Sequence, residues 1–323
     1  MKIGKRIGLK EGKATRDAFG EALRELGRER PNIVVVDGDV ANSTRTELFG
    51  QAFPERFFSV GIAESNMVGV ASGLALAGKE PWAASFACFV MCNAFDQLRM
   101  SVALPNLNVK IVGSHAGVTI GEDGPSQMGI EDVALACALP NFTVVVPADE
   151  PSTRAATRAL AEHVGPAYLR TGRPKFPIVY ANGCDQFRLG RAILLRDGTD
   201  VTLIGNGLMV AACLEAAELL AEEGLQARVL DMHTVKPLDE EAVMDAAIRT
   251  GAVVTAEEHL LRGGLGAAVA QAVARLHPVP MRFVGLNDVY AESGDPDTLL
   301  AAYGLTPEHI VAAALDVIKQ KPT

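Results

Sequence analysis

Residues 56–78 read RFFSVGIAESNMVGVASGLALAG, and this stretch sets a single acid between an expected strand and an expected helix. Its first five residues are strand-like, and residues 64–76 predict a helix whose Gly and Ala positions allow close packing. Glu64 therefore falls at a helix start, where it is expected to be half buried. A carboxyl group in that position either stabilises the helix dipole or handles a proton.

Short β-branched runs alternate with Ala-rich helical stretches on both sides of this segment. Strands are expected first at residues 32–36, 81–86, 109–113, 143–146 and 167–170, and later at 201–204, 227–230, 252–255 and 281–284. Helices are expected at residues 15–28, 64–76, 94–103, 151–163 and 310–318, with Pro151 in a first turn and Thr306 as a cap. This alternation predicts an α/β fold of two consecutive domains, each a mostly parallel sheet flanked by helices. We place the domains at residues 12–175 and 191–323, with a linker at residues 176–190.

The composition excludes several classes of function. The chain has 323 residues, of which 49% are hydrophobic and 5% aromatic, and its net charge is −9. An acidic chain with few aromatic residues does not predict a nucleic-acid surface. No signal peptide and no apolar window of about 18 residues occurs, so we expect a cytoplasmic protein without a membrane span. The basic residues within 2–13 predict a solvated N-terminal arm.

The five cysteines are odd in number and lack zinc-ribbon spacing, which predicts reduced core thiols instead of disulfides or a metal site. Asp37 and Asp39 resemble a metal-binding turn, but no further oxygen ligands lie nearby in the sequence. We therefore expect no metal site made by this chain alone.

Residues 113–128 read GSHAGVTIGEDGPSQM and leave the carboxyl end of an expected strand, which is where ligands bind in α/β sheets. The density of glycines, acids, histidine and amide predicts a functional loop. The alternative is a capping turn in which Asp123 and Ser126 bond backbone amides. Phe86 and Phe89 follow another strand, and their spacing is typical either of a core or of a pocket for a flat heterocycle.

Four motifs together resemble the transketolase family: residues 61–67, 85–89, 94–100 and 121–128. Residues 14–16, 235–239 and 263–266 extend this likeness to nearly the whole chain. The resemblance covers the pyrimidine-binding and C-terminal domains of that family. The family's diphosphate-binding domain carries a Gly-Asp-Gly motif, and no Gly-Asp-Gly occurs in this sequence. The resemblance therefore implies one subunit of a split enzyme.

The same resemblance implies that thiamine diphosphate lies across a subunit interface. Its aminopyrimidine would contact this chain, and its diphosphate and Mg²⁺ would be held by an N-terminal diphosphate-binding partner subunit. Two copies of each subunit are expected, and neither chain is expected to be active alone.

The resemblance also assigns roles to individual residues. Glu64 matches the glutamate that bonds the aminopyrimidine ring, and a carboxyl shielded from water suits proton transfer. Phe86 and Phe89 match the aromatic pocket around that ring. The residues that match the substrate site are Asp123 and Gln127 for sugar hydroxyls, and Arg16, Ser43, His115 and Arg173 for a sugar phosphate. His259 matches a structural position.

One segment departs from the family pattern. Residues 90–94 are one residue longer than the usual motif and lack its basic residue, which predicts an altered pocket floor. The expected reaction is transfer of a two-carbon ketol unit from a ketose phosphate to an aldose. The alternatives are a deoxyxylulose phosphate synthase-like enzyme, the β chain of a 2-oxo acid dehydrogenase, and a non-catalytic binding protein with this fold.

Overall fold

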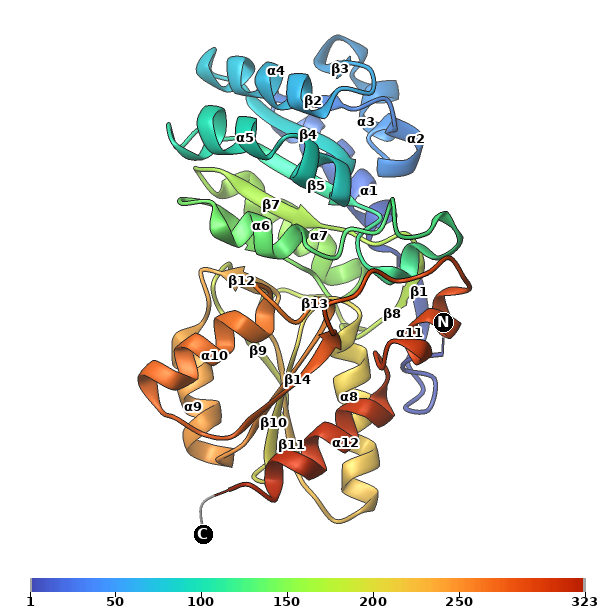
Figure 1. Cartoon of the computed structure of the whole chain (residues 1–323). Helices are drawn as coiled ribbons and strands as arrows, with labels where there is room; N and C mark the ends of the chain where they lie inside the picture. Colours follow the sequence, from blue (N-terminus) through green and yellow to red (C-terminus); the bar gives the residue numbers. More distant parts are fainter. Residues whose placement is uncertain (1, 322–323) are drawn as a thin grey trace.

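Two sheets, each covered by helices on both faces, organise the chain (Figure 1). This computed structural model describes residues 2–321. Within them, one seven-stranded sheet has the order β12-β6-β7-β5-β4-β2-β3, and one five-stranded sheet has the order β14-β13-β10-β11-β9. Neighbouring strands are parallel, except that β12 and β9 each pair antiparallel at an edge. The predicted fold class is therefore confirmed.

The strands of the first half are β1 (Glu11–Ala14), β2 (Ile33–Asp37), β3 (Phe57–Ser59), β4 (Glu80–Phe86), β5 (Lys110–Ser114), β6 (Thr143–Val145), β7 (Ala167–Arg170) and β8 (Lys175–Pro177). Its helices are α1 (Thr15–Glu29), α2 (Ala41–Thr44), α3 (Glu47–Ala52), α4 (Glu64–Leu76), α5 (Phe95–Gln97), α6 (Asp132–Ala138) and α7 (Glu150–Glu162). Short 3₁₀ turns are η1 (Pro54–Arg56) and η4 (Val118–Asp123), and two π-helical segments are η2 (Phe89–Asn93) and η3 (Leu98–Ala103).

The strands of the second half are β9 (Ile193–Arg196), β10 (Val201–Gly205), β11 (Ala227–Asp231), β12 (Thr234–Lys236), β13 (Val253–Leu260) and β14 (Met281–Leu286). Its helices are α8 (Met209–Glu222), α9 (Glu240–Thr250), α10 (Leu265–Leu276), α11 (Pro296–Ala302) and α12 (Pro307–Ile318). None of the helices within residues 2–321 combines the length and the apolar character that a membrane crossing requires.

Most predicted elements lie where the sequence placed them. Helix α4 begins at Glu64 and ends at Leu76, as predicted. Helix α7 begins after Asp149, whose side chain accepts from Ser152 N in a capping box, and Pro151 lies in its first turn. Thr306 stands at the cap position of α12, but its hydroxyl bonds His309 Nδ1 and not the backbone.

The helix predicted at residues 94–103 is present from Phe95 to Ala103, but most of it is not α-helical. Only Phe95–Gln97 is α-helical, and the π-helices η2 and η3 lie on either side of it. A π-helix closes its hydrogen bonds five residues apart, so its turn holds more residues than an α-helical turn. Helix η2 lies where the sequence is one residue longer than the family motif, and such a turn can accommodate that residue.

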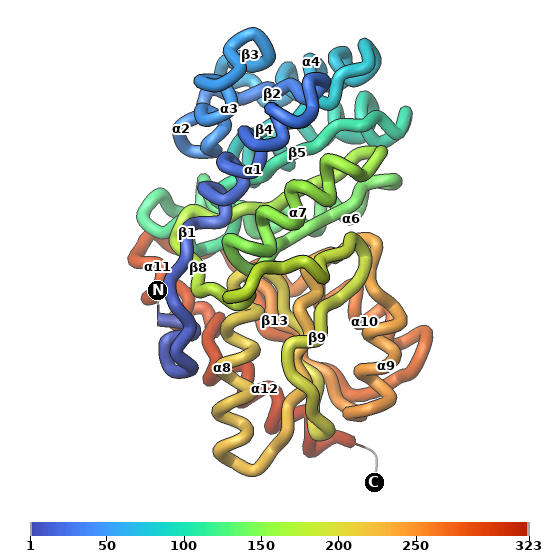
Figure 2. Tube along the Cα trace, turned by 180° about the vertical axis from the view of Figure 1, so that it is seen from behind, coloured from blue at the N-terminus to red at the C-terminus, as the bar shows by residue number. Residues whose placement is uncertain are grey.

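The basic side chains of the N-terminal arm are exposed to solvent, as predicted, but the arm also packs against the protein. Ile3 is buried, Gly4 N donates to the Glu215 carboxylate, and Arg6 forms an ion pair with Glu222. Both acids belong to α8, so the arm packs on the second half of the chain, as Figure 2 shows from behind. Strand β1 then pairs antiparallel with β8.

The cysteine prediction is correct for most thiols and wrong for one. All five are free; Cys88, Cys184 and Cys213 are buried, Cys137 is half-buried, and Cys92 is exposed. Cys92 lies in the π-helical segment η2, whose buried residues are Val90 and Met91.

Candidate active site

The carboxyl ends of β2, β4, β5 and β7 meet at one edge of the seven-stranded sheet, because these strands are parallel neighbours. Strands β3 and β4 lie on opposite sides of β2, so the chain reverses its direction of travel through the sheet there. Ligands of open α/β sheets bind in the crevice outside such a switch point. We therefore expect a ligand site at the carboxyl ends of β2 and β4.

Glu64 is the first residue of α4 and lies over that crevice. Its fractional exposure to solvent is only 5%. Its Oε1 accepts a hydrogen bond of 2.9 Å from Ser85 Oγ, near the end of β4. A Cβ built on Gly38, which follows β2, would lie 3.5 Å from the same oxygen. The buried carboxyl group thus joins the ends of both strands.

Two half-buried phenylalanine rings come from the segment that directly follows Ser85, the partner of this carboxyl group. Phe86 is the last residue of β4, and its ring stacks on that of Phe89 with a centroid distance of 5.5 Å and an interplanar angle of 5°. His115 also stacks on Phe86, at 4.0 Å and 9°. The two phenylalanines therefore present aromatic surface at the strand ends, as a pocket for a flat ring requires.

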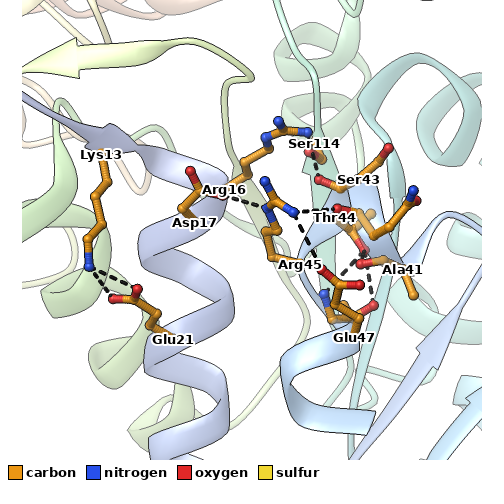
Figure 3. A network of polar contacts seen from close by, with 12 residues as sticks. Lys13, Arg16, Asp17, Glu21, Ala41, Ser43, Thr44, Arg45, Glu47 and Ser114 are labelled. Atoms are coloured by element: carbon orange, nitrogen blue, oxygen red, sulfur yellow. Dashed lines mark hydrogen bonds and ion pairs between the residues drawn. The ribbon is translucent and has the colours of Figure 1, made fainter. Parts of the chain in front are cut away.

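A cationic group extends the site along the same edge. Arg16 Nη1, from the first turn of α1, donates to Ser43 O at 3.1 Å and lies 3.0 Å from His115 Nε2. Figure 3 shows Arg16 reaching toward Ser43, with Arg45 bound to Asp17 beside it at 2.5 Å. Burial and the neighbouring charge of Arg45 lower the pKa of Arg16, which marks a crowded cationic pocket.

His115 is neutral in this arrangement. Arginine can only donate, so His115 Nε2 accepts from Arg16 while Nδ1–H donates to Ser114 Oγ at 2.8 Å. Burial, followed by the charges of Arg16, Arg173 and Arg45, lowers the pKa of His115 to about 3. The backbone φ of 58° at His115 lies in the left-handed region and turns the ring toward Phe86.

The neutral histidine predicts a pH dependence of stability. The folded-state pKa of about 3 is below the unfolded value of 6.5. The stabilisation of the folded state by neutral His115 is therefore complete above pH 6.5 and is lost as the pH falls toward 3. Relative to His115→Asn, which tolerates left-handed backbone, the wild type should lose up to about 2 kcal/mol of unfolding free energy by pH 5. Denaturant unfolding of both proteins between pH 8 and 4 measures this difference, and parallel pH profiles would contradict it.

The residues matched to sugar hydroxyls lie on the loop of residues 113–128. Arg173, which follows β7, donates to Ile120 O at 2.8 Å and to Asp123 Oδ1 at 3.2 Å. Asp123 therefore pairs with an arginine instead of capping a backbone amide, so the capping-turn interpretation of this residue is wrong. Gln127 is half-buried, and its Oε1 accepts from Ser126 Oγ.

These contacts bring the predicted residues into one region. Arg16, Ser43, His115 and Phe86 form a continuous set of contacts, and Glu64 joins it through Ser85, the neighbour of Phe86. The loop contacts this set as well, because Cys88, which lies between Phe86 and Phe89 in the sequence, donates from Sγ to Gln127 O at 3.2 Å.

His259 lies elsewhere, buried beside α6. Its Nε2 accepts from Ala134 N at 3.3 Å, and its Nδ1 donates to Leu260 O at 2.8 Å. Both ring nitrogens therefore bond the backbone, which fits the structural role implied by the resemblance.

Sequence reasoning missed two supports of the site. Asp37 is fully buried at the end of β2, where it accepts from Val40 N and from the hydroxyls of Thr44 and Thr46. Burial raises the pKa of Asp37, and these bonds oppose that shift. The bonds fix the segment that carries Ser43. No role was predicted for Ser85, although its place one residue before the end of β4 was a usable signal.

No group of three or more His, Cys, Asp or Glu side chains within residues 2–321 is arranged to hold a metal ion. A pair of aromatic rings, a buried carboxyl group and an arginine-lined edge can instead bind a planar heterocycle beside a small anion.

Comparison with known proteins matches two family models, described as "Transketolase, pyrimidine binding domain" over residues 11–178 and "Transketolase, C-terminal domain" over residues 190–310. The chain is 43% identical to a "Putative transketolase C-terminal section" of Methanocaldococcus jannaschii, over 96% of this chain and 98% of that protein. It is 45% identical to "6-deoxy-6-sulfo-D-fructose transketolase subunit SqwH" of Clostridium sp., over 95% of each. A solved structure described as "Split gene transketolase, inactive beta4 tetramer" is 48% identical, with a TM-score of 0.89 over 96% of this chain and all of that one.

Proposed function

Because the chain belongs to the transketolase family, we propose that it is the C-terminal (beta) subunit of a split, thiamine diphosphate-dependent transketolase. It transfers a two-carbon ketol unit from a ketose phosphate to an aldose or aldose phosphate. The observation that carries this proposal is the buried Glu64 at the switch point, bonded to Ser85, whose neighbour Phe86 stacks on Phe89 and on His115, the partner of Arg16.

The residues at the switch point fit the aminopyrimidine of thiamine diphosphate. Glu64 offers a carboxyl group held by Ser85, and the half-buried rings of Phe86 and Phe89 offer apolar surface for a heterocycle. When bound, thiamine diphosphate supplies the nucleophilic carbon that cleaves the ketose beside its carbonyl. Glu64 holds a proton at the pyrimidine nitrogen, and the burial of its carboxyl group excludes competing water.

The arginine-lined edge binds the anionic end of the sugar. Arg16 and Arg173 supply the positive charge, while Ser43 and the neutral His115 complete the set. Asp123 and Gln127 are assigned to sugar hydroxyls. The Clostridium relative is named for a sulfonated sugar, and phosphate and sulfonate are both tetrahedral anions that arginines bind.

The partner is an N-terminal subunit that holds the diphosphate and Mg²⁺. The similar split-gene structure is described as an inactive tetramer of beta chains. Inactivity of a tetramer of beta chains agrees with our proposal, in which the active enzyme contains two copies of each subunit.

The choice of donor tests the reaction class. The assembled enzyme should transfer a ketol unit from xylulose 5-phosphate to an aldose acceptor and should leave pyruvate unchanged. Release of carbon dioxide from pyruvate, without ketol transfer from xylulose 5-phosphate, would favour a deoxyxylulose phosphate synthase-like or 2-oxo acid dehydrogenase reaction and overturn the proposal.

A further inference from the structure

The loop of residues 113–128 is held in place by the second half of the chain. Glu258, on β13, is buried, and its Oε1 accepts a hydrogen bond of 2.7 Å from Thr119 N. A Cβ on Gly117 would lie 2.1 Å from that same oxygen, and Gly117 has a φ of 83°. Only glycine allows the loop to approach the carboxyl group this closely.

Glu258 lies at the carboxyl end of β13, beside the switch point of the five-stranded sheet. Strand β10 lies between β11 and β13, so the chain crosses from one side of β10 to the other after β11. The crevice at the carboxyl ends of β10 and β13 is thus the switch point of the second sheet, where such sheets bind ligands. Here the crevice receives the first half of the chain: Glu258 binds the loop, and Gly207 N donates to Val146 O.

A buried arginine fixes the end of the same loop. Arg170 donates to Gly129 O and to Glu258 O, and it pairs with Asp132 at 2.8 Å. Burial raises the pKa of Glu258, while the charge of Arg170 and the hydrogen bond from Thr119 N oppose that shift. The carboxyl group is therefore placed where its surroundings offset part of the cost of burying it.

The tip of the loop also lies against the second half, as Figure 1 shows beside α11. A Cβ on Gly121 would lie 3.1 Å from Gly294 O, and one on Gly124 would lie 2.3 Å from Ser293 Oγ. Residues of the second half of the chain thus hold the loop near its start and at its tip, and Arg170 of β7 holds the chain just after its end.

We propose that Glu258 is a positioning residue that fixes the loop of residues 113–128 on the second domain, so that His115, Asp123 and Gln127 are presented to the substrate. Its effect on catalysis rests on the proposed function, because the residue contacts neither the proposed cofactor nor the proposed substrate set. The second domain then acts as a rigid backing for the substrate loop.

The adjacent residue provides a matched control. Glu257 is buried like Glu258 but points away from the loop, where it accepts from Leu265 N at 2.7 Å and Gly266 N at 2.8 Å. It caps the first turn of α10. Substitution of Glu257 therefore disturbs the same strand and removes the same charge without releasing the loop.

The test compares Glu258→Ala, Glu258→Gln and Glu257→Gln by hydrogen exchange of the full chain and by kinetics of the assembled enzyme. Glu258→Ala should speed amide exchange within residues 116–120 by about tenfold or more and raise KM for xylulose 5-phosphate by about tenfold, because Thr119 N loses its acceptor. The kcat and the affinity for thiamine diphosphate should stay within about twofold. Glu258→Gln keeps an acceptor oxygen and should restore most of the loss, whereas Glu257→Gln should change exchange only around α10.

A second variant tests the contact from the loop side. Gly117→Ala places a methyl group against the Glu258 carboxyl and should give the same changes in exchange and KM, even if Glu258→Ala does not fold. Wild-type exchange and KM in the folded variants would overturn the inference. An equal fall in kcat and in cofactor affinity would also overturn it. If the wild-type assembly transfers no ketol unit, the proposed function fails, and the exchange measurement alone decides whether Glu258 holds the loop.

Discussion

Glu64→Gln is expected to lower the ketol-transfer rate of the assembled enzyme by about 10²- to 10⁴-fold, the range that a positioned acid or base contributes. The amide cannot exchange a proton with the pyrimidine nitrogen. Its oxygen can still accept from Ser85 Oγ, so the site keeps its local geometry. Steady-state kinetics at saturating thiamine diphosphate measure the loss.

Two controls separate lost chemistry from lost structure. The free energy of unfolding of Glu64→Gln, measured with denaturant, should lie within about 1 kcal/mol of the wild-type value, because the hydrogen bond with Ser85 can be kept. Ser85→Ala removes the partner but leaves the carboxyl group, so its rate should fall less than that of Glu64→Gln. Near wild-type turnover in Glu64→Gln would rule out Glu64 as the proton-handling residue.

Arg173→Ala is expected to raise KM for phosphorylated sugars by about 10- to 100-fold, because it removes a charge-assisted hydrogen bond at the anion. KM for an unphosphorylated ketose should change far less. Arg173 is partly exposed, and it also bonds Asp123 and Ile120 O, so a general effect of the lost charge or of loop disturbance must be excluded.

Lys175→Ala controls for a general effect of the lost charge, and the comparison of phosphorylated with unphosphorylated sugars controls for loop disturbance. Lys175 lies two residues further along, carries the same charge, and pairs at 3.4 Å with Glu11 on the neighbouring strand β1. Its substitution should leave both KM values within about twofold, since removal of an exposed ion pair has little effect. Equal losses for phosphorylated and unphosphorylated sugars in Arg173→Ala would contradict the phosphate assignment.

The local parts of the fold were predictable because their signals lie within short stretches of sequence. The strand, the acid and the small-residue helix around Glu64 are adjacent, and α4 has the predicted bounds. The site contacts were not predictable from spacing: Arg16 and His115 are 99 positions apart, and they meet because the first turn of α1 lies beside the carboxyl end of β5. The resemblance to the transketolase family supplied the set of site residues.

The errors arose where long-range partners or backbone hydrogen bonds decide the structure. The basic N-terminal arm gave no sign of Glu215 and Glu222, the acids that bind it from α8. Strand β12 was missed because it has three residues and joins the edge of the first sheet from the second half of the chain. The π-helical pattern of η2 depends on hydrogen-bond register, which apolar periodicity does not reveal.

The most direct test of the central claim is to purify this chain together with a subunit that carries the diphosphate-binding domain, and to assay each chain alone and the mixture. The assay follows ketol transfer from xylulose 5-phosphate to ribose 5-phosphate with thiamine diphosphate and Mg²⁺. We predict activity in the mixture and none with either chain alone. A stable complex that binds thiamine diphosphate but transfers no ketol unit from any sugar phosphate would contradict the account.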